Sequence, residues 1–472
     1  MPSAIPNAAR RLSEVALSNP SRDSCKLIAM RIDRALLIVA LLALSAPALA
    51  LEAPSASPSA ASQSKGSDLR PLKPAPDEDV SVSSMRLLAP GIGWAEISVS
   101  RDSSDSSEQV YYWTTDNGAH WKNITPHAPR KQELADFFFL DTHRGWALSD
   151  LPAEEQDYSQ SRTVSLTVAA TTDAGATWSK TPLTLRLKDY FSKDTLSGLN
   201  SIYVNRIAFA DPLHGWLQLG FWIGMHGHTT FLLVTSDGGK TWKEADSYPG
   251  PNSSDMVLVT PDEGWVFGTV EPDGTPNSLF VTRDGTKNWQ ELSAQPITNL
   301  GDVKEWHEML LRPGGVLDAE GADCEVHRLP MFQDAVHGFL EEDCAVDVSM
   351  GDLDSMHTTV LFATNDAGRT WKPNRTLTNF VGQCNSSTMV GASWIAPVMK
   401  AGHIALVRVA AGSTVDAGAE NGSISRYSLC QTSLSFVSLT RGWMLLTDKG
   451  TLRSTTDGGR TWTTLTPGRN RR

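Results

Sequence analysis

Between residues 80 and 466, short apolar runs alternate with clusters of Gly, Asp and Asn. The runs are rich in β-branched and aromatic residues, as in Phe231–Thr235 and Ser278–Thr282, and each ends at a turn cluster. No stretch of useful length keeps the 3.6-residue period of an amphipathic helix. Short strands joined by tight turns are typical of an all-β fold.

Two motifs recur together six times along this region. The first is a Thr-x-Asp turn that ends in Trp, at residues 114–121, 171–178, 235–242, 282–289, 364–371 and 455–462. The second is a Gly followed by Trp or Phe, at residues 92–94, 144–146, 214–216, 263–265, 337–339 and 441–443. It precedes the first by 19 to 32 residues, counted between the aromatic positions. This compound pattern indicates an internal structural repeat.

Each recurring position of the first motif has a physical role. The Asp side chain accepts hydrogen bonds from backbone N–H groups of its own turn, as in an Asx-turn. Gly two residues later supplies a positive φ, and the Trp packs between neighbouring sheets. The fourth copy has Thr286 in place of that Gly, so we expect a distorted turn there. The predicted structural residues are Asp116, Asp173, Asp237, Asp284, Asp366 and Asp457, with Trp121, Trp178, Trp242, Trp289, Trp371 and Trp462.

A repeat of this size cannot bury its apolar face alone, and a ring of such units forms a single β-propeller. Successive turn Trp residues lie 57, 64, 47, 82 and 91 residues apart, so the later gaps have room for a further unit. Residues 385–410 contain Gly391, Trp394 and a β-prone run at 404–409, which could form a blade without an Asp turn. Division of residues 80–466 into units of roughly 55 residues favours seven blades, with six as the alternative.

The Asp turn with its Trp resembles the Asp-box, or bacterial neuraminidase repeat, of sialidases and other propellers. The compound unit of both motifs more closely resembles the photosystem II stability/assembly factor family. That resemblance covers about residues 80–466 and implies a non-catalytic scaffold for protein binding or assembly. The alternative is a sialidase-like glycoside hydrolase or a glycan-binding propeller.

The amino terminus predicts export. Arg31 and Arg34 precede an apolar run at residues 35–44, which is followed by the small-residue cleavage pattern at residues 48–50. The run is shorter than the about 20 residues of a membrane-spanning helix, so we expect no transmembrane segment after cleavage. Residues 1–50 are therefore the signal region, with Met30 where a signal peptide would begin, and the protein is expected to be periplasmic or secreted. Residues 51–79, rich in Ala, Pro and Ser, are expected to form a disordered linker.

The net charge of −12 disfavours nucleic acid as a ligand, because an acidic surface repels phosphate. The expected partner is a protein, in a membrane or exported complex, with a glycan as the alternative.

The cysteine count suits an oxidising compartment. Cys324, Cys344, Cys384 and Cys430 follow the cleavage site, and four Cys permit three pairings. The pairs Cys324–Cys344 and Cys384–Cys430 are favoured because each would close one long insertion; four buried free thiols are the alternative.

No catalytic, cofactor-binding or metal-binding residue is predicted. Residues 328–330 match a sialidase Arg-Leu-Pro motif but follow the fourth Asp turn instead of preceding the first, and no Glu can be paired with Tyr427. His226 and His228 lie two residues apart, without an identifiable third metal ligand. The acidic stretch that begins at Glu341 is interpreted as a solvated loop.

The signal region gives the first testable prediction. The exported protein should begin at Leu51, because residues 48–50 form the small-residue cleavage pattern. Intact-mass measurement and N-terminal sequencing of the exported protein check this, and retention of residues 35–50 would contradict it.

Overall fold

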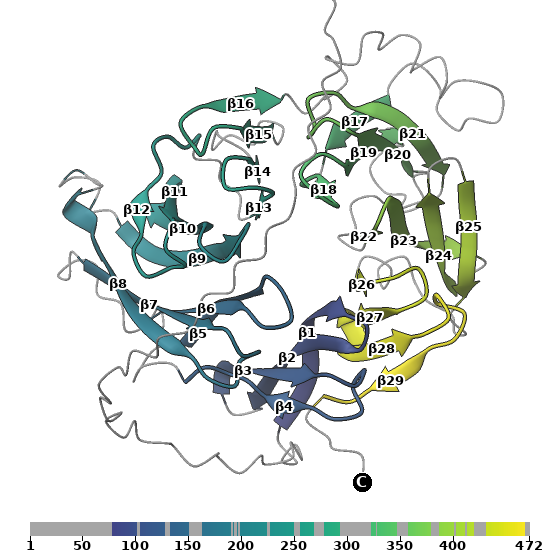
Figure 1. The fold of residues 1–472 in the computed structure, drawn as a ribbon, viewed down its shortest axis with the longest axis horizontal. Helices are drawn as coiled ribbons and strands as arrows, with labels where there is room; N and C mark the ends of the chain where they lie inside the picture. The colour runs from purple at the N-terminus through teal and green to yellow at the C-terminus, as the bar shows by residue number, and fades with distance from the viewer. Residues whose placement is uncertain are drawn as a thin grey trace, which may run out of the picture. The chain divides into compact units, whose positions relative to one another are not determined.

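The computed structural model describes residues 78–101, 104–127, 133–150, 163–189, 192, 196, 199–223, 227–249, 255–268, 278–292, 322–326, 328–346, 357–378, 387–400, 403–410, 413–419 and 431–467. The chain divides into the units Met1–Ser67 and Asp68–Arg472, and every described residue belongs to the second. Seven antiparallel sheets make a ring, so this unit is a seven-bladed β-propeller (Figure 1).

Each of the first four blades is a sheet of four consecutive strands. Blade 1 contains β1 (Glu78–Ala89), β2 (Ile92–Arg101), β3 (Ser104–Thr114) and β4 (Lys122–Asn123). Blade 2 contains β5 (Glu133–Phe139), β6 (Gly145–Asp150), β7 (Thr163–Thr171) and β8 (Ser179–Arg186). Blade 3 contains β9 (Leu199–Phe209), β10 (Gly215–Ile223), β11 (Gly227–Thr235) and β12 (Lys243–Glu244). Blade 4 contains β13 (Asp255–Leu258), β14 (Gly264–Gly268), β15 (Ser278–Thr282) and β16 (Trp289–Leu292).

The last three blades continue the order. Blade 5 contains β17 (Ala322–Val326), β18 (Met331–Phe332), β19 (Gly338–Val346), β20 (His357–Thr364) and β21 (Lys372–Thr378); β17 and β18 both pair with β19. Blade 6 contains β22 (Thr388–Val390), β23 (Ser393–Lys400), β24 (His403–Ala410) and β25 (Ser413–Ala419). Blade 7 contains β26 (Thr432–Phe436), β27 (Gly442–Leu446), β28 (Thr451–Thr455) and β29 (Thr463–Leu465). Two short 3₁₀ turns, η2 (Leu187–Asp189) and η4 (Thr447–Lys449), follow β8 and β27.

Blade 6 decides between six and seven blades. Its Thr-x-Asp sequence, Thr414 to Asp416, lies within strand β25 and leads to no Trp, so it makes no Asp turn. The four strands nevertheless cover the region marked as a degenerate unit, and β24 contains the β-prone run at 404–409. The prediction of seven blades is therefore confirmed.

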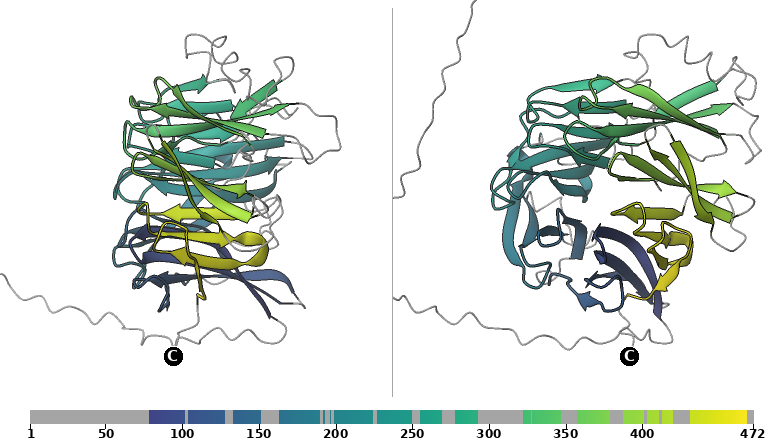
Figure 2. Two further views of the ribbon diagram at one scale, coloured as in Figure 1. Left: turned by 90° about the vertical axis from the view of Figure 1, so that its right-hand side faces the viewer. Right: turned by 45° about the vertical axis from the view of Figure 1, so that its right-hand side comes forward.

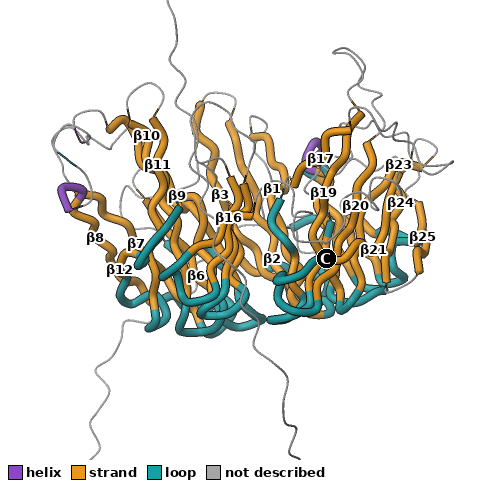
Figure 3. The backbone as a smooth tube through the Cα atoms, turned by 90° about the horizontal axis from the view of Figure 1, so that it is seen from above, coloured by secondary structure: helices purple, strands orange, loops and turns teal. Residues whose placement is uncertain are grey.

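The first strand of each blade lies toward the centre of the ring, and the last strand lies outermost (Figure 1). The strands of successive blades run side by side when the ring is viewed from its edge (Figure 2). The described loops gather along one face, at the lower edge of Figure 3. We call this the Asp-turn face, because each Asp turn hydrogen-bonds to the loop that precedes the Gly-Trp strand of its own blade. The Gly238 N–H, for example, donates to the Leu213 carbonyl at 2.9 Å.

The six Asp turns share one hydrogen-bond pattern. The Thr hydroxyl donates to the Asp carboxylate at 2.8–3.1 Å and accepts the N–H two residues after the Asp at 2.8–3.1 Å. The same carboxylate accepts a backbone N–H four residues after the Asp at 2.8–2.9 Å. These donors, with the hydroxyl of Thr241 first among them, lower the pKa of Asp237 to about 2. Each Asp carboxylate is therefore an ionised cap of its turn rather than a proton donor.

The fourth turn keeps this pattern, so the expected distortion is wrong. Thr286 adopts a φ of 76°, close to the values of the Gly residues that it replaces. Its hydroxyl accepts the Asp246 N–H at 3.3 Å, and its carbonyl accepts the Ser247 N–H at 2.9 Å. These bonds to the preceding blade hold a β-branched residue in a conformation that it rarely adopts.

The hydrophobic core of the described residues consists of seven layers, one at each junction between neighbouring blades. The aromatic residue of the Gly-Trp motif packs against the following blade. Trp146 stacks on Phe209 of blade 3 with ring centroids 3.6 Å apart, and Trp265 lies 6.2 Å from Trp371 of blade 5. The turn Trp residues are less enclosed than expected, because Trp121 and Trp371 are buried whereas the other four are partly exposed.

Blades 1 and 7 close the ring without exchanging a strand. The closing contacts repeat those of the other junctions, with Trp443 lying 5.8 Å from Trp121 between ring centroids. In addition, the Leu87 N–H donates to Ser435 Oγ at 2.9 Å. The ring is therefore held closed at this seam by side-chain packing and a few hydrogen bonds.

The strand register bears on one of the favoured disulfides. Cys324 on β17 is the direct partner of Cys344 on β19 in the antiparallel pair. Partners in such a pair have Cα atoms about 4.5–5.5 Å apart, which lies within the range that a disulfide spans. The bond itself stays a prediction, and Cys384 and Cys430 lie outside the described residues.

A matched pair of glycine substitutions tests the junction packing. Gly239 and Gly368 occupy the same turn position at φ values of 87° and 70°, so alanine is strained at both by about 1–2 kcal/mol. At Gly368 a Cβ would also lie 2.6 Å from Trp265 of blade 4, whereas at Gly239 the nearest atom is 3.5 Å away. We expect Gly368→Ala to lower the free energy of unfolding by about 1–3 kcal/mol more than Gly239→Ala. Equal losses in chemical denaturation would contradict this account of the junction.

Candidate functional site: the central cavity

A cavity of about 910 Å³ lies where the innermost strands converge. Its walls come from β1, β5, β9, β13, β18 and β22, together with the residues that flank them. These strands belong to six different blades, so residues far apart in the sequence share one site. Three arginines line this cavity, Arg86, Arg206 and Arg328, together with three aspartates, Asp136, Asp255 and Asp334.

Arg86 on β1 is the cation that carries the least compensation. Its side chain is exposed to the cavity, and its guanidinium lies 5.7 Å from the centre of the Phe138 ring. Within the described part of the chain, no carboxylate forms an ion pair with it. The surrounding protein desolvates the guanidinium and, with the nearby charge of Arg206, lowers the pKa of Arg86. An anion that entered the cavity would relieve both effects.

Arg206 on β9 lies near two carboxylates. Its Nη2 is 3.5 Å from Asp255 Oδ1 on β13, and its charge also acts on Asp136 on β5. Burial raises the pKa of Asp136, while Arg206 and the N–H groups of Ile207 and Phe137, at 2.5 and 2.8 Å, oppose that rise. The cavity wall therefore carries charges of both signs, with Arg206 compensated by acids and Arg86 available to bind an anion.

Arg328 is bound within the wall. Its Nη2 is 3.0 Å from Glu341 Oε2 on β19, and its Nη1 donates to Ser387 Oγ at 2.8 Å. Glu341 also accepts the Ser387 hydroxyl and the indole N–H of Trp394, the latter at 2.6 Å. Because Glu341 is 3% exposed, this ion pair is buried. Oε1 of Glu341 accepts both hydrogen bonds, whereas Oε2 is met by the Arg328 guanidinium alone. The network joins blades 5 and 6. It takes the place of an Asp turn, which blade 6 does not have.

The interpretation of the acidic stretch as a solvated loop is wrong at its beginning. Glu341 and Glu342 are adjacent on β19, the second strand of blade 5, and both are buried. Glu342 pairs with Val326 and Val360 in register and points to the side opposite Glu341. Among the described residues, its carboxyl oxygens have no hydrogen-bond partner, and burial raises the pKa of Glu342 to about 8.

A Tyr–Glu pair lies behind the cavity wall. Tyr111 on β3 is the register partner of Glu96 on β2, and its ring stacks on Phe137 with centroids 3.9 Å apart. Tyr111 is 3% exposed, and burial, followed by the charges of Glu96 and Asp136, raises the pKa of its hydroxyl. The Tyr111 hydroxyl is therefore a neutral, buried group behind the cavity wall.

The sequence contained a signal for this site that the motif analysis missed. Asp136, Arg206 and Asp255 each lie ten residues before the Trp of their Gly-Trp motif, and Arg86 lies eight before its own. A charged residue at that distance is on the innermost strand and faces the ring axis. His226, the side chain of His228, and Tyr427 lie outside what the structure describes.

The described residues contain no group of three or more His, Cys, Asp or Glu side chains arranged to hold a metal ion. The same part of the chain contains no helix with the length and apolar character needed to cross a bilayer.

The chain matches no family model and no curated protein. Several solved structures are similar. They include YCF48 bound to D1 peptide, at 17% identity over 72% of this chain and 84% of that one, with a TM-score of 0.36. YCF48 from Cyanidioschyzon merolae matches at 15% identity over 72% and 86%, also with a TM-score of 0.36.

Trypanosoma rangeli sialidase in complex with the inhibitor DANA matches at 15% identity over 69% of this chain, with a TM-score of 0.36. The match spans 53% of the sialidase. YCF48 and sialidases are thus both among the structural neighbours, and at these identities the likeness extends to the propeller fold alone.

Glu342 gives a prediction about pH. The Glu342 carboxyl has a pKa of about 8 in the folded protein and near 4.5 in the unfolded chain. Its contribution to the free energy of unfolding is therefore fully present below pH 4.5. That contribution is lost as the pH rises toward 8, at up to about 1.4 kcal/mol per pH unit. Glu342→Gln has no such proton, so its stability relative to the native protein should increase from pH 5 to pH 8.

Chemical denaturation at several pH values measures this difference. Glu244→Gln on the exposed strand β12 is the control, because water surrounds that side chain in both states. A constant difference between Glu342→Gln and the native protein across this range would show that Glu342 is charged and compensated in the fold.

Proposed function

We propose that this protein is a non-catalytic, exported scaffold that binds an acidic segment of a partner protein in its central cavity. The observation that supports the proposal is Arg86, a guanidinium exposed to a large cavity and without a carboxylate partner among the described residues. Arg–carboxylate contacts are charge-assisted and directional, which suits recognition of a protein side chain or terminus.

The remainder of the cavity favours a polypeptide over a simple anion. Apolar side chains such as Phe138, Met256 and Met331 line the wall between the charged groups. Asp136 and Asp255 can meet N–H groups or basic side chains of the same segment. One similar structure, YCF48, holds a D1 peptide, but the proposal rests on the cavity.

A carbohydrate-active enzyme is the second candidate, favoured by the presence of three arginines and three carboxylates in one cavity. Two features oppose it, since Arg328 is neutralised by Glu341 and Tyr111 is buried. Hydrolysis of a fluorogenic sialoside by the native protein, abolished in Asp136→Asn, would establish this function instead.

The scaffold is tested by the double variant Arg86→Gln/Arg206→Gln. A tagged full-length chain, expressed with its signal region in the producing cell, is recovered after mild crosslinking, and its partners are identified by mass spectrometry. Each lost charged hydrogen bond weakens binding by about 1.5–3 kcal/mol, so we expect at least tenfold less partner on the double variant.

Arg186→Gln is the matched control, because Arg186 is exposed on the outermost strand β8 of blade 2. It should retain the partner at the native level. Equal recovery on all three proteins would place the partner elsewhere on the ring.

A further inference from the structure

Two carboxyl groups interact at the junction of blades 1 and 2. Glu96 is on β2, and Asp136 is on the innermost strand β5, where it lines the central cavity. Burial raises the pKa of Glu96, hydrogen bonds from Ser83 and Tyr111 oppose that rise, and the charge of Asp136 adds to it. We call Glu96 and Asp136 the carboxyl pair, because a proton held by one of them affects the other.

Asp136 is fixed at the cavity wall by main-chain donors. Its Oδ2 accepts the Ile207 N–H at 2.5 Å, and its Oδ1 accepts the Phe137 N–H at 2.8 Å. Ile207 follows Arg206 in β9, so the first bond joins the innermost strands of blades 2 and 3. Burial raises the pKa of Asp136, and the charge of Arg206 is the main effect that opposes it.

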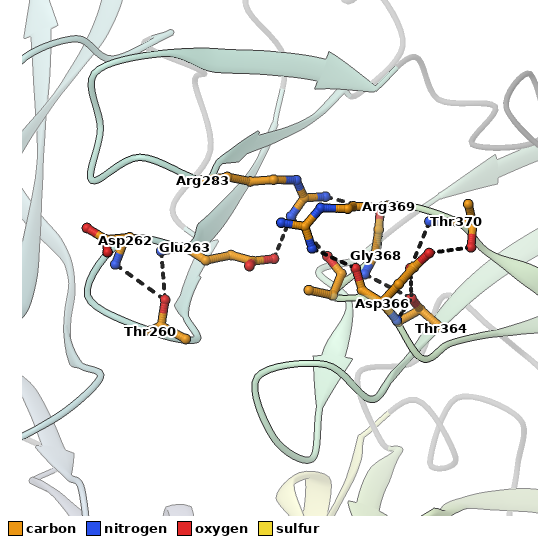
Figure 4. A network of polar contacts seen from close by, with 10 residues as sticks. Thr260, Asp262, Glu263, Arg283, Thr364, Asp366, Gly368, Arg369 and Thr370 are labelled. Carbon is orange, nitrogen blue, oxygen red and sulfur yellow. Dashed lines mark hydrogen bonds and ion pairs between the residues drawn. The ribbon is translucent and has the colours of Figure 1, made fainter. Parts of the chain in front are cut away.

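Arg206 is less firmly neutralised than Arg283, which crosses the junction of blades 4 and 5. Arg283 donates to Glu263 at 2.5 Å and to two main-chain carbonyls of blade 5 at 2.9 and 3.1 Å (Figure 4). The ion pair of Arg206 with Asp255 is 3.5 Å long, and both side chains are about half exposed. A ligand carboxylate that enters the cavity can therefore take the place of Asp255 at Arg206.

A bound carboxylate changes the charge balance at the carboxyl pair. Arg86 and Arg206 both line the cavity, and Arg206 lowers the pKa of Asp136 against the effect of burial. When a ligand anion neutralises Arg206, that effect is cancelled, and the pKa of Asp136 rises further. A proton taken up by the pair then removes the repulsion between the pair and the ligand.

We propose that the carboxyl pair takes up one proton when an acidic segment binds to Arg86 and Arg206, so that the cavity binds its partner more tightly at lower pH. The two events are linked in both directions, because a ligand that favours protonation is itself favoured by protonation to the same extent. This inference rests on the proposed function and adds a regulation of the same site.

The other titratable groups around the cavity do not have this property. Tyr111 is buried and its pKa is raised, so its hydroxyl stays neutral. Asp334 at the cavity rim accepts N–H groups of its own loop, which lower its pKa to about 2. Asp255 is about half exposed, and the charge of Arg328 is matched by Glu341. The proton is therefore assigned to the carboxyl pair.

Isothermal titration calorimetry with the purified full chain tests the proposal. The probe is an N-acetylated, C-amidated peptide of alternating Asp and Ala residues, whose carboxylates stay ionised from pH 5.5 to pH 8. Titrations at pH 6.5 in Bis-Tris and in imidazole, cationic buffers that differ in ionisation enthalpy, report the protons taken up. We expect up to one proton per peptide, and a dissociation constant at least tenfold lower at pH 5.5 than at pH 8.

Glu96→Gln/Asp136→Asn removes both titrating groups. It should bind the peptide without proton uptake, and at pH 8 at least tenfold more tightly than the native protein, because the negative charge of the pair is gone. Glu96→Gln alone keeps the main-chain bonds of Asp136 and serves if the double variant folds poorly. Its proton uptake at pH 6.5 should fall at least twofold, because Asp136 then ionises without a like charge beside it.

Two control variants should take up protons as the native protein does. Asp189→Asn changes an exposed carboxyl group on the η2 turn, outside the cavity. His337→Gln removes the histidine that lies 2.8 Å from Asp334, because histidine also changes charge in this pH range. Loss of the uptake in either control would place the proton elsewhere and overturn the proposal.

Two further outcomes separate this inference from the proposed function. Binding of the peptide with no proton uptake, and with the same dissociation constant at pH 5.5 and pH 8, would overturn the inference and leave the scaffold in place. Absence of binding at both pH values, or equal binding by Arg86→Gln/Arg206→Gln, would overturn the scaffold and the inference together.

Discussion

Each Asp turn depends on one buried threonine hydroxyl, which lies between a carboxylate and a backbone N–H. In blade 5, Thr364 donates to Asp366 at 2.8 Å and accepts the Gly368 N–H at 2.9 Å. This pair of bonds holds two consecutive residues at positive φ and reverses the chain within the turn. The reversal places the turn glycine against the preceding blade, so a local bond also sets the geometry of the junction.

Blade 6 shows what replaces the turn where it is missing. Arg328, Glu341, Ser387 and Trp394 form a buried network between blades 5 and 6. A buried ion pair is tolerated only when its polar atoms are satisfied, because each charge loses its hydration. A hydroxyl and an indole bond to Glu341 Oε1, and Arg328 pairs with its Oε2, so this junction is held by polar bonds. At the junction of blades 4 and 5, by contrast, the turn glycine Gly368 packs against Trp265.

The repeat made the fold predictable, because its information is local: Thr, Asp, Gly and Trp act within eight residues of each other. Blade 6 was predicted without the full motif, from the β-prone run at residues 404–409. The central cavity could not be predicted in this way, since Arg86, Asp136 and Arg206 meet only after three blades have closed around the axis. The burial of Glu341 and Glu342 was missed for a related reason, as an acidic run on the second strand of a blade has the composition of a loop.

The innermost strands explain why the fold leaves the function open. Their cavity-facing side chains meet solvent rather than another sheet, so Arg86 and Arg206 have no role in the apolar layers between blades. Residues there can change without loss of the ring, and one propeller can therefore present different chemistry in different proteins. The ring follows from the junctions between blades, whereas the choice between a scaffold and an enzyme depends on the cavity. In this chain the cavity holds Arg86, which no described carboxylate neutralises, beside Arg328, which Glu341 neutralises, and the buried Tyr111 lies behind its wall.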